Sequence, residues 1–150
     1  LDGSSFSYIR PEYPAVASYD VLQALIEAAE ILKVHYHVGI TATTSDFYAG
    51  QGRPTRGVTI QNELIENLQR AHVLNFEMEL ATLFVLSSIF GLRAGGVCAV
   101  FADRVRNLFE AGAGELEAAR VACEAVRILG EWDKQRRRKG KRFFYPSLLH

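Results

Sequence analysis

The strongest constraint on the fold of this chain is an unbroken apolar run at residues 94–102, with the sequence AGGVCAVFA. Its adjacent glycines and its valines make the run a poor helix, and its lack of polar positions is typical of a strand covered on both faces. Covered strands of this kind occur in sheets that have helices on each side. We therefore expect a central strand in an α/β sheet.

Strand-like and helix-like segments alternate along the rest of the chain, as α/β sheets require. Further strands are expected at residues 36–44 and 73–76. Apolar residues at helical spacing predict four helices, at residues 19–33, 60–71, 80–90 and 115–130. Ser18 and Thr59 are the expected N-caps of the first two helices.

Two of the expected helices carry predictions about burial. The helix at residues 80–90 is apolar on all sides, so most of its surface should be covered. The helix at residues 115–130 is amphipathic, and the spacing of its apolar residues predicts an inward face made of Leu116, Ala119, Val121, Ala122, Val126 and Leu129.

The composition is that of an ordinary globular domain, with 49% hydrophobic residues in a chain of 150. The 17 basic and 17 acidic side chains balance, so we expect no general attraction to nucleic acid or membranes. Without a membrane-length apolar run or a signal peptide, a cytoplasmic location is expected. Cys98 and Cys123 lie in apolar segments and should be reduced packing residues.

The ends of the chain differ from its middle. It begins without Met on a loop-like DGSS sequence, which suggests that a segment precedes it. Residues 131–150 form a basic C-terminal extension to a domain at 1–130, with the run KQRRRKGKR at 134–142. Such a run indicates nucleic acid or an acidic partner, or else a solvated extension, which is the interpretation we favour.

A loop after the strand at 36–44 carries Phe47, Gln51 and Arg53 within a stretch bent by glycines. The Gln amide offers an acceptor beside a donor, and the Arg guanidinium offers several donors, so the pair matches the O2, N3–H and O4 edge of uracil. Phe47 would cover a face of the ring. If the bond from N1 to a sugar breaks, the same Arg stabilises the negative charge on the departing base.

Polar groups also follow the other two expected strands. Glu77 and Glu79 flank Met78 after residues 73–76, and Asp103 with Arg104 follows the run at 94–102. Strand ends in an open α/β sheet converge on one crevice, where a carboxylate can bind the hydroxyl pair of a ribose. For Glu77, stabilisation of a helix N-terminus is an equal alternative. His35 and His37 have no third ligand at suitable spacing, so we expect no metal.

Two motifs give these positions a family context. The segments VGITATTSDFYAGQGR at 38–53 and NFEMELATL at 75–83 resemble the uridine phosphorylases of the nucleoside phosphorylase-I superfamily. The resemblance runs from residue 1 to about 130. It implies a three-layer α/β fold with a central mixed sheet, of which an N-terminal part that binds phosphate is absent here.

The resemblance also implies a role for each site residue. Phe47 would pack on uracil while Gln51 and Arg53 bind its edge, and Phe76, Glu77, Met78 and Glu79 would hold the ribose. Phe101 and Ala102 would line the base pocket. Arg104 would begin a flap over residues 104–114, and Arg53, Gln51 and Arg104 would be the catalytic residues.

The activity implied is that of a pentosyltransferase: reversible phosphorolysis of uridine to uracil and ribose 1-phosphate, without an organic cofactor and with phosphate as co-substrate. Homo-oligomers, dimers or hexamers, are implied as well. Asp103 stands where the close bacterial pattern has Asn, and related purine enzymes use an Asp there as an acid. A purine nucleoside phosphorylase, a nucleosidase and a non-catalytic nucleoside-binding fragment therefore remain alternatives.

Overall fold

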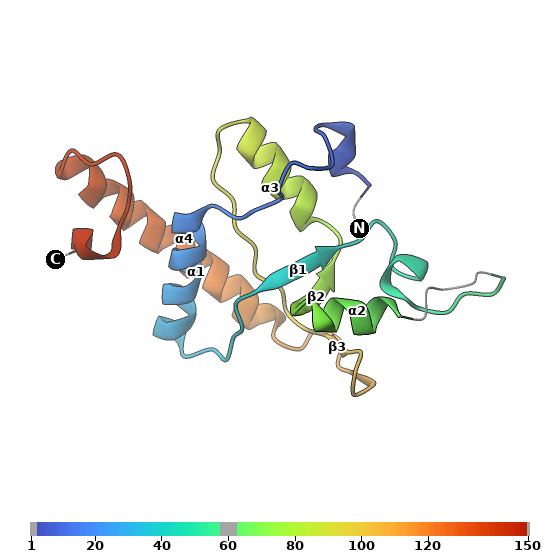
Figure 1. Cartoon of the computed structure of the whole chain (residues 1–150). Coiled ribbons are helices and arrows are strands. Elements are labelled where there is room, and N and C mark those ends of the chain that lie inside the picture. Colours follow the sequence, from blue (N-terminus) through green and yellow to red (C-terminus); the bar gives the residue numbers. More distant parts are fainter. Residues whose placement is uncertain (1–2, 58–62, 150) are drawn as a thin grey trace. The chain divides into compact units, whose positions relative to one another are not determined.

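The computed structural model of the chain describes residues 3–57 and 63–149, and it divides into two compact units (Figure 1). The first unit combines Leu1–Val16 with His37–Ala94. The second combines Ala17–Tyr36 with Gly95–His150. Each unit therefore contains two stretches that are distant in the sequence.

The first unit is built on a parallel pair of strands, β1 (Ile40–Thr43) and β2 (Val73–Glu77), which lie side by side in Figure 1. Parallel neighbours need a crossover, and here it contains η2 (Ala49–Gln51) and α2 (Leu64–Arg70). His72 has a left-handed backbone with φ of 56°, which turns the chain from α2 directly into β2. Both strands were expected, but β1 begins later than residue 36, and Thr59 lies outside the described residues.

Helix α3 (Leu80–Ile89) follows β2 and has no charged residue along its length. The short helix η1 (Ser5–Ser7), which precedes β1 in the sequence, contacts α3. Val85 is fully buried, but Leu83 and Ile89 are 45% and 44% exposed. Of the ten residues of α3, only Leu83, Ser88 and Ile89 are exposed, so the prediction that most of α3 is covered is confirmed for the described chain.

The second unit is built on two packed helices, α1 (Tyr19–Leu32) and α4 (Glu115–Arg138) (Figure 1). The side of α1 that faces α4 consists of small residues, Ala24, Ala28 and Ala29. The side of α4 opposite them carries three larger residues, Val121, Ile128 and Trp132, together with Ala125. This spacing of three and four residues is that of one helix face, and the alanines allow the two backbones to approach closely.

Helix α4 corrects two sequence predictions. It continues to Arg138 instead of ending at residue 130, because Trp132 extends its buried stripe by another turn. The predicted inward residues Leu116 and Val126 are 59% and 70% exposed, whereas Leu129 does pack against the core. The prediction for Val121 is confirmed, since this residue is 4% exposed. The buried stripe continues from it through Ala125 and Ile128 to Trp132, beyond the predicted end of the helix.

The apolar run at 94–102 also departs from its prediction. Residues 92–101 contain no helix or strand, and only β3 (Ala102–Asp103) pairs, antiparallel with β4 (Leu108–Phe109). Val97 and Val100 are 40% and 64% exposed, as the side chains of a covered central strand would not be. An apolar run becomes a central strand only where neighbouring strands supply its hydrogen bonds.

Two further sequence features, the cysteines and the hydropathy of the helices, can be compared with the structure. Cys98 and Cys123 form no disulfide, but both are exposed, so the expectation that they pack in the interior was wrong. In the part of the chain that the structure describes, every helix is too short or too polar to cross a membrane.

The α1–α4 core gives a direct prediction. Trp132 is 5% exposed, and its ring stacks on that of Phe144 with centroids 3.9 Å apart and planes at 7°. We expect Trp132→Ala to lower the free energy of unfolding by about 3–5 kcal/mol, because it removes this contact and leaves a cavity. Urea denaturation followed by circular dichroism measures the change.

Leu116→Ala is the matched control, since Leu116 lies on the same helix but is exposed. Its cost should stay within about 0.5 kcal/mol, as for most surface substitutions. Equal losses in the two variants would show that Trp132 is not part of the core.

Candidate active site

The parallel pairing of β1 and β2 brings two predicted site segments to the same edge of the sheet (Figure 1). Thr43, the last residue of β1, pairs with Glu77, the last residue of β2. The Thr44 amide then donates to the Glu77 carbonyl at 2.9 Å, which extends the pairing by one residue. The loop with Gln51 and Arg53 and the turn with Glu79 therefore start from adjacent points.

The first of these segments, residues 44–53, is folded around a buried hydroxyl. Thr44 is 1% exposed, and its Oγ1 accepts a hydrogen bond from Nε2 of Gln51 at 3.2 Å. Gln51 itself is 6% exposed. On the exposed side of the loop, the carboxylate of Asp46 accepts a hydrogen bond from the Gly50 amide at 2.8 Å. Gln51 is thus a fixed, interior residue of the loop.

Gly52 has φ of 65°, a left-handed conformation suited to glycine, and it directs the chain from Gln51 to Arg53. The Arg53 amide donates to the Tyr48 carbonyl at 2.8 Å. The Arg53 guanidinium lies over the Phe47 ring, with Cζ 4.0 Å from its centroid. One face of Phe47 is therefore covered by Arg53.

One atom of this arrangement is unsatisfied. Arg53 Nε is buried and has no hydrogen-bond partner among the described residues. Buried donors in proteins are almost always paired, so an orphaned donor in a candidate site indicates a place where a ligand acceptor fits. The guanidinium has donors to offer such an acceptor.

The second segment is organised by the carboxylate of Glu77. One oxygen, Oε2, accepts from the amides of Glu79 at 2.8 Å and Leu80 at 2.5 Å, at the start of α3. The other, Oε1, accepts from the hydroxyls of Thr41 at 3.4 Å and of Thr43. Glu77 thereby stabilises the N-terminus of α3, where a negative charge is favourable.

Sequence reasoning missed the part that these threonines play. The Thr43 hydroxyl both donates to Glu77 and accepts from the Ala81 amide at 3.0 Å, so it joins β1 to the first turn of α3. Thr41 and Thr43 alternate along a strand and so lie on the same face of it. Two threonines in alternation, opposite an acidic residue on the neighbouring strand, are the sequence pattern that could have predicted these hydrogen bonds.

The remaining residues of this turn are accessible. Met78 is 38% exposed, and its amide donates to the Glu79 carboxylate at 3.1 Å. Glu79 is exposed at the N-cap position of α3, while Phe76 is partly buried in β2 opposite Ala42. With Phe47 47% exposed, the first unit presents these groups on an open surface.

The other predicted site residues lie in the second unit. Phe101 is 38% exposed, and its carbonyl accepts from the Glu110 amide at 2.8 Å. Ala102 pairs with Phe109 in the β3–β4 hairpin, and Arg104 lies in the turn that follows β3. The expected flap over 104–114 therefore consists of this turn, the strand β4 and a further turn.

The Asp103 carboxylate has a local function in that hairpin. Its Oδ1 accepts from the amides of Val105 at 3.0 Å and Arg106 at 2.9 Å, and Oδ2 lies 3.6 Å from Arg106 Nε. Asp103 thus stabilises the turn as an acceptor. Within the ranges 3–57 and 63–149, no group of three or more His, Cys, Asp or Glu residues is placed to hold a metal.

Comparison with known proteins places this geometry in a family. Residues 1–129 match the family model described as the phosphorylase superfamily. The chain belongs to the phosphorylase superfamily. Its helices, its parallel strand pair and its antiparallel hairpin are therefore parts of the superfamily's α/β fold, as the motifs at 38–53 and 75–83 predicted.

Individual relatives are similar over most of this chain. It is 56% identical over 151 residues to a uridine phosphorylase of Thermococcus kodakarensis, covering 99% of this chain and 54% of that protein. A uridine phosphorylase of Escherichia coli is 37% identical over 137 residues, which cover 86% and 54%. A guanosine phosphorylase of Halorubrum lacusprofundi is 37% identical over 99 residues, covering 66% and 37%. The chain spans about half the length of the uridine phosphorylases it matches.

The hydrogen bonds of Thr43 lead to a stability prediction. Thr43→Val keeps the shape of the side chain but removes the hydroxyl that joins Glu77 to Ala81, and it leaves these partly buried polar groups without that partner. We expect a loss of about 1–3 kcal/mol in the free energy of unfolding. Chemical denaturation measures it.

Thr41→Val serves as the comparison, because the Thr41 hydroxyl makes only long contacts, at 3.3 Å to the Asn75 carbonyl and 3.4 Å to Glu77. Its cost should be clearly smaller. If the two variants are equally stable, the Thr43 hydroxyl does not join the strand to the helix.

Proposed function

We propose that this chain provides the base and ribose sites of a uridine phosphorylase, which converts uridine and phosphate reversibly to uracil and ribose 1-phosphate. The observation that carries the proposal is that the loop with Gln51 and Arg53 and the turn with Glu79 begin at paired strand ends, Thr43 and Glu77. The similarity to uridine phosphorylases supports the same assignment.

The base would bind through the loop at 44–53. Gln51, held by Thr44, presents an amide that can donate and accept, and Arg53 adds donors, one of which is the orphaned Nε. Together they match the alternating acceptors and donor of the uracil edge. A base that stacks on Phe47 moves the guanidinium from the ring face to the edge of the base.

The ribose would bind at the turn after β2. The exposed Glu79 carboxylate is the natural acceptor for the 2'- and 3'-hydroxyls, and Met78 is accessible beside it. Because Glu77 fixes the amides of Glu79 and Leu80, the backbone that carries Glu79 is held before the sugar arrives. A preorganised site of this kind loses less entropy when the sugar binds.

The reaction breaks the bond between N1 of uracil and C1' of the ribose, and a phosphate oxygen forms the new bond to C1'. The electron pair of the broken bond passes to the base, so negative charge develops on the uracil oxygens while positive charge develops on the sugar. Arg53 stabilises the first charge and the Glu79 carboxylate the second. The residues that bind phosphate are expected in the part of the uridine phosphorylase sequence that this chain does not cover, about half of its length.

A purine nucleoside is the second candidate, because a guanosine phosphorylase is among the relatives and Asp103 is an acid in the predicted region. The Asp103 carboxylate, however, already accepts hydrogen bonds from the amides of Val105 and Arg106, so its role in the hairpin needs no bound purine. The Gln51 and Arg53 pair, which matches the uracil edge, supports uridine over a purine nucleoside. Dimers or hexamers remain the assembly expected from the resemblance.

Turnover of uridine and of inosine, each with and without phosphate, tests the assignment. We expect the unsubstituted protein to release uracil from uridine only when phosphate is present, and to release little hypoxanthine from inosine. Arg53→Ala should lower kcat/KM for uridine by about 100- to 1000-fold, the usual loss when a donor to a developing oxyanion is removed.

Arg56→Ala is the control, because Arg56 is an exposed cation three residues further along the same segment. Its activity should match the unsubstituted protein. Preferred turnover of inosine, or full uridine activity in Arg53→Ala, would refute the role given to Gln51 and Arg53.

Glu79 is tested by separating the sugar from the base. Glu79→Gln should weaken uridine binding by about tenfold or more, because a charged acceptor of two hydroxyls is lost. Binding of free uracil should not change. Calorimetric titration with each ligand measures both affinities, and Glu66→Gln, in the surface pair with Arg70, is the control. Equal weakening for uridine and uracil would mean that Glu79 does not act on the sugar.

A further inference from the structure

The neutral charge of this chain conceals a strong separation of charge. Residues 131–150 carry seven cationic and two acidic side chains, a formal charge of +5, whereas residues 1–130 carry ten and fifteen, a charge of −5. All seven cations lie between Lys134 and Arg142 without an acidic residue among them. The family model ends at residue 129, whereas the similarity to the Thermococcus kodakarensis protein covers 99% of the chain and therefore includes most of this charged segment.

The end of the segment folds back onto α4, while residues 137–143 are all exposed to solvent, as expected of a solvated extension. After α4 ends, Gly140 adopts a left-handed conformation with φ of 62°, and the chain turns back. Phe144 stacks on Trp132, and Leu148 in η3 (Pro146–Leu149) is 1% exposed. The Lys139 ammonium donates to the Leu148 carbonyl at 2.6 Å. These contacts fix the return segment against the helix end.

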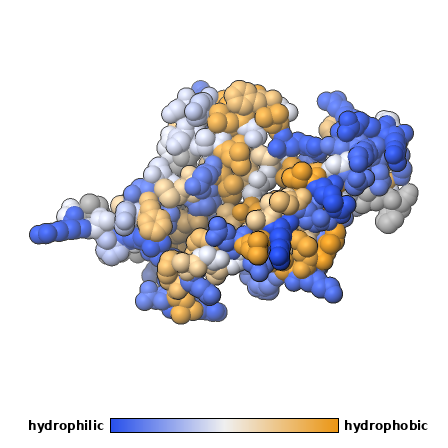
Figure 2. Space-filling model, turned by 180° about the vertical axis from the view of Figure 1, so that it is seen from behind, coloured by the Kyte–Doolittle hydropathy of each residue, from blue (hydrophilic) through white to orange (hydrophobic). Residues whose placement is uncertain are grey.

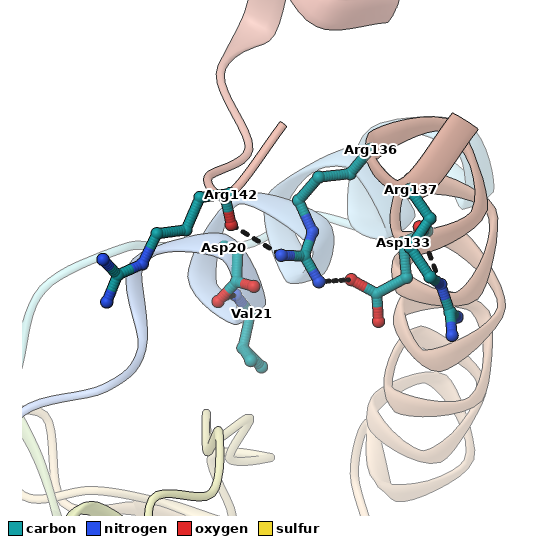
Figure 3. Close-up of polar contacts among 6 residues, drawn as sticks. All are labelled: Asp20, Val21, Asp133, Arg136, Arg137 and Arg142. Carbon is teal, nitrogen blue, oxygen red and sulfur yellow. Dashed lines mark hydrogen bonds and ion pairs between the residues drawn. The ribbon is translucent and has the colours of Figure 1, made fainter. Parts of the chain in front are cut away.

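Hydrogen bonds to backbone carbonyls position the arginines without neutralising them. Arg136 donates to the Arg142 carbonyl at 2.5 Å, and Arg137 donates to the Asp133 carbonyl at 3.2 Å (Figure 3). In the same view the Arg142 guanidinium points away from α4. Figure 2 shows strongly hydrophilic side chains gathered over the end of α4 and the return segment.

Only some of these cations are paired with carboxylates. Lys134 contacts Glu131 at 2.9 Å, a hydrogen bond that lowers the pKa of this carboxyl, and Arg136 contacts Asp133 at 3.3 Å. Four exposed cations form no ion pair with the described residues: Arg137, Arg138, Lys141 and Arg142. Four positive charges close together in this way repel one another unless anions lie beside them.

Aromatic side chains lie among the cations. Phe143 is 69% exposed, and the Arg142 guanidinium lies 5.1 Å from its ring centroid. Tyr145 is 40% exposed. Cations that follow a phosphate backbone, together with aromatic rings on which bases stack, are the combination by which proteins bind single strands.

We propose that the cationic surface formed by residues 134–145 binds single-stranded nucleic acid. Another copy of the chain, in which residues 1–130 carry a formal charge of −5, would use the charges but would not supply flat bases to stack on the exposed Phe143 ring. A flat anionic surface such as a membrane would use the charges but not the stacking of Phe143. The proposal does not depend on the phosphorylase assignment, since none of these residues belongs to the candidate active site.

Fluorescence anisotropy with labelled 12-nucleotide oligouridylate and oligothymidylate tests this proposal. We expect both to bind, with log K falling linearly against log salt at a slope of about −3, as four phosphate contacts on a single strand predict. Arg138→Gln with Lys141→Gln should reduce the slope to about −1.5. Phe143→Ala should weaken binding by about 5- to 100-fold with little change in the slope.

The control exchanges two exposed cations of the same unit that lie outside this surface, Lys33→Gln with Arg120→Gln, and should leave binding unchanged. Circular dichroism checks that every variant is folded. Failure of the oligonucleotides to bind in 50 mM salt, or equal losses in the control, would overturn the proposal. So would binding only to phosphatidylserine vesicles, or salt-sensitive self-association, measured by light scattering, without oligonucleotide binding.

Discussion

The Glu77 carboxylate is the group on which the candidate site depends. It accepts hydrogen bonds from two threonine hydroxyls of β1 and from two amides at the start of α3, so a strand, its neighbour and a helix meet at one side chain. Charged acceptors make stronger hydrogen bonds than neutral ones. The backbone of Met78 and Glu79 is therefore fixed by a residue that need not touch the substrate itself.

The parallel register then determines what can be recognised there. Because Thr43 is opposite Glu77, the loop that carries Gln51 and Arg53 and the turn that carries Glu79 leave the sheet at adjacent points. A ligand with two chemically different ends, a flat heterocycle and a polyhydroxyl sugar, suits two such segments. On the loop side, Arg53 keeps its buried Nε without a partner among the described residues, and its guanidinium covers one face of Phe47.

Local patterns predicted the elements well where the pattern itself determines the structure. The boundaries of α1, β2 and α3 agree to within about one residue, because caps, β-branched residues and apolar spacing act over a few residues. The run at 94–102 was predicted wrongly, since a central strand depends on the strands that pair with it. In the site, the glycine-bent loop predicted Arg53 and the position after a strand predicted Glu77. The role of Thr43 was not predicted, because its partner Glu77 is 34 residues away in the sequence.

A crystal structure of the protein with uridine bound tests the central claim most directly. The account predicts that Gln51 and Arg53 lie at hydrogen-bond distance, about 2.7–3.2 Å, from the uracil edge, while the Glu79 carboxylate binds the ribose hydroxyls and Glu77 keeps its bonds to Thr43 and Leu80. A nucleoside held by other residues, with the Arg53 guanidinium still lying over Phe47, would contradict it.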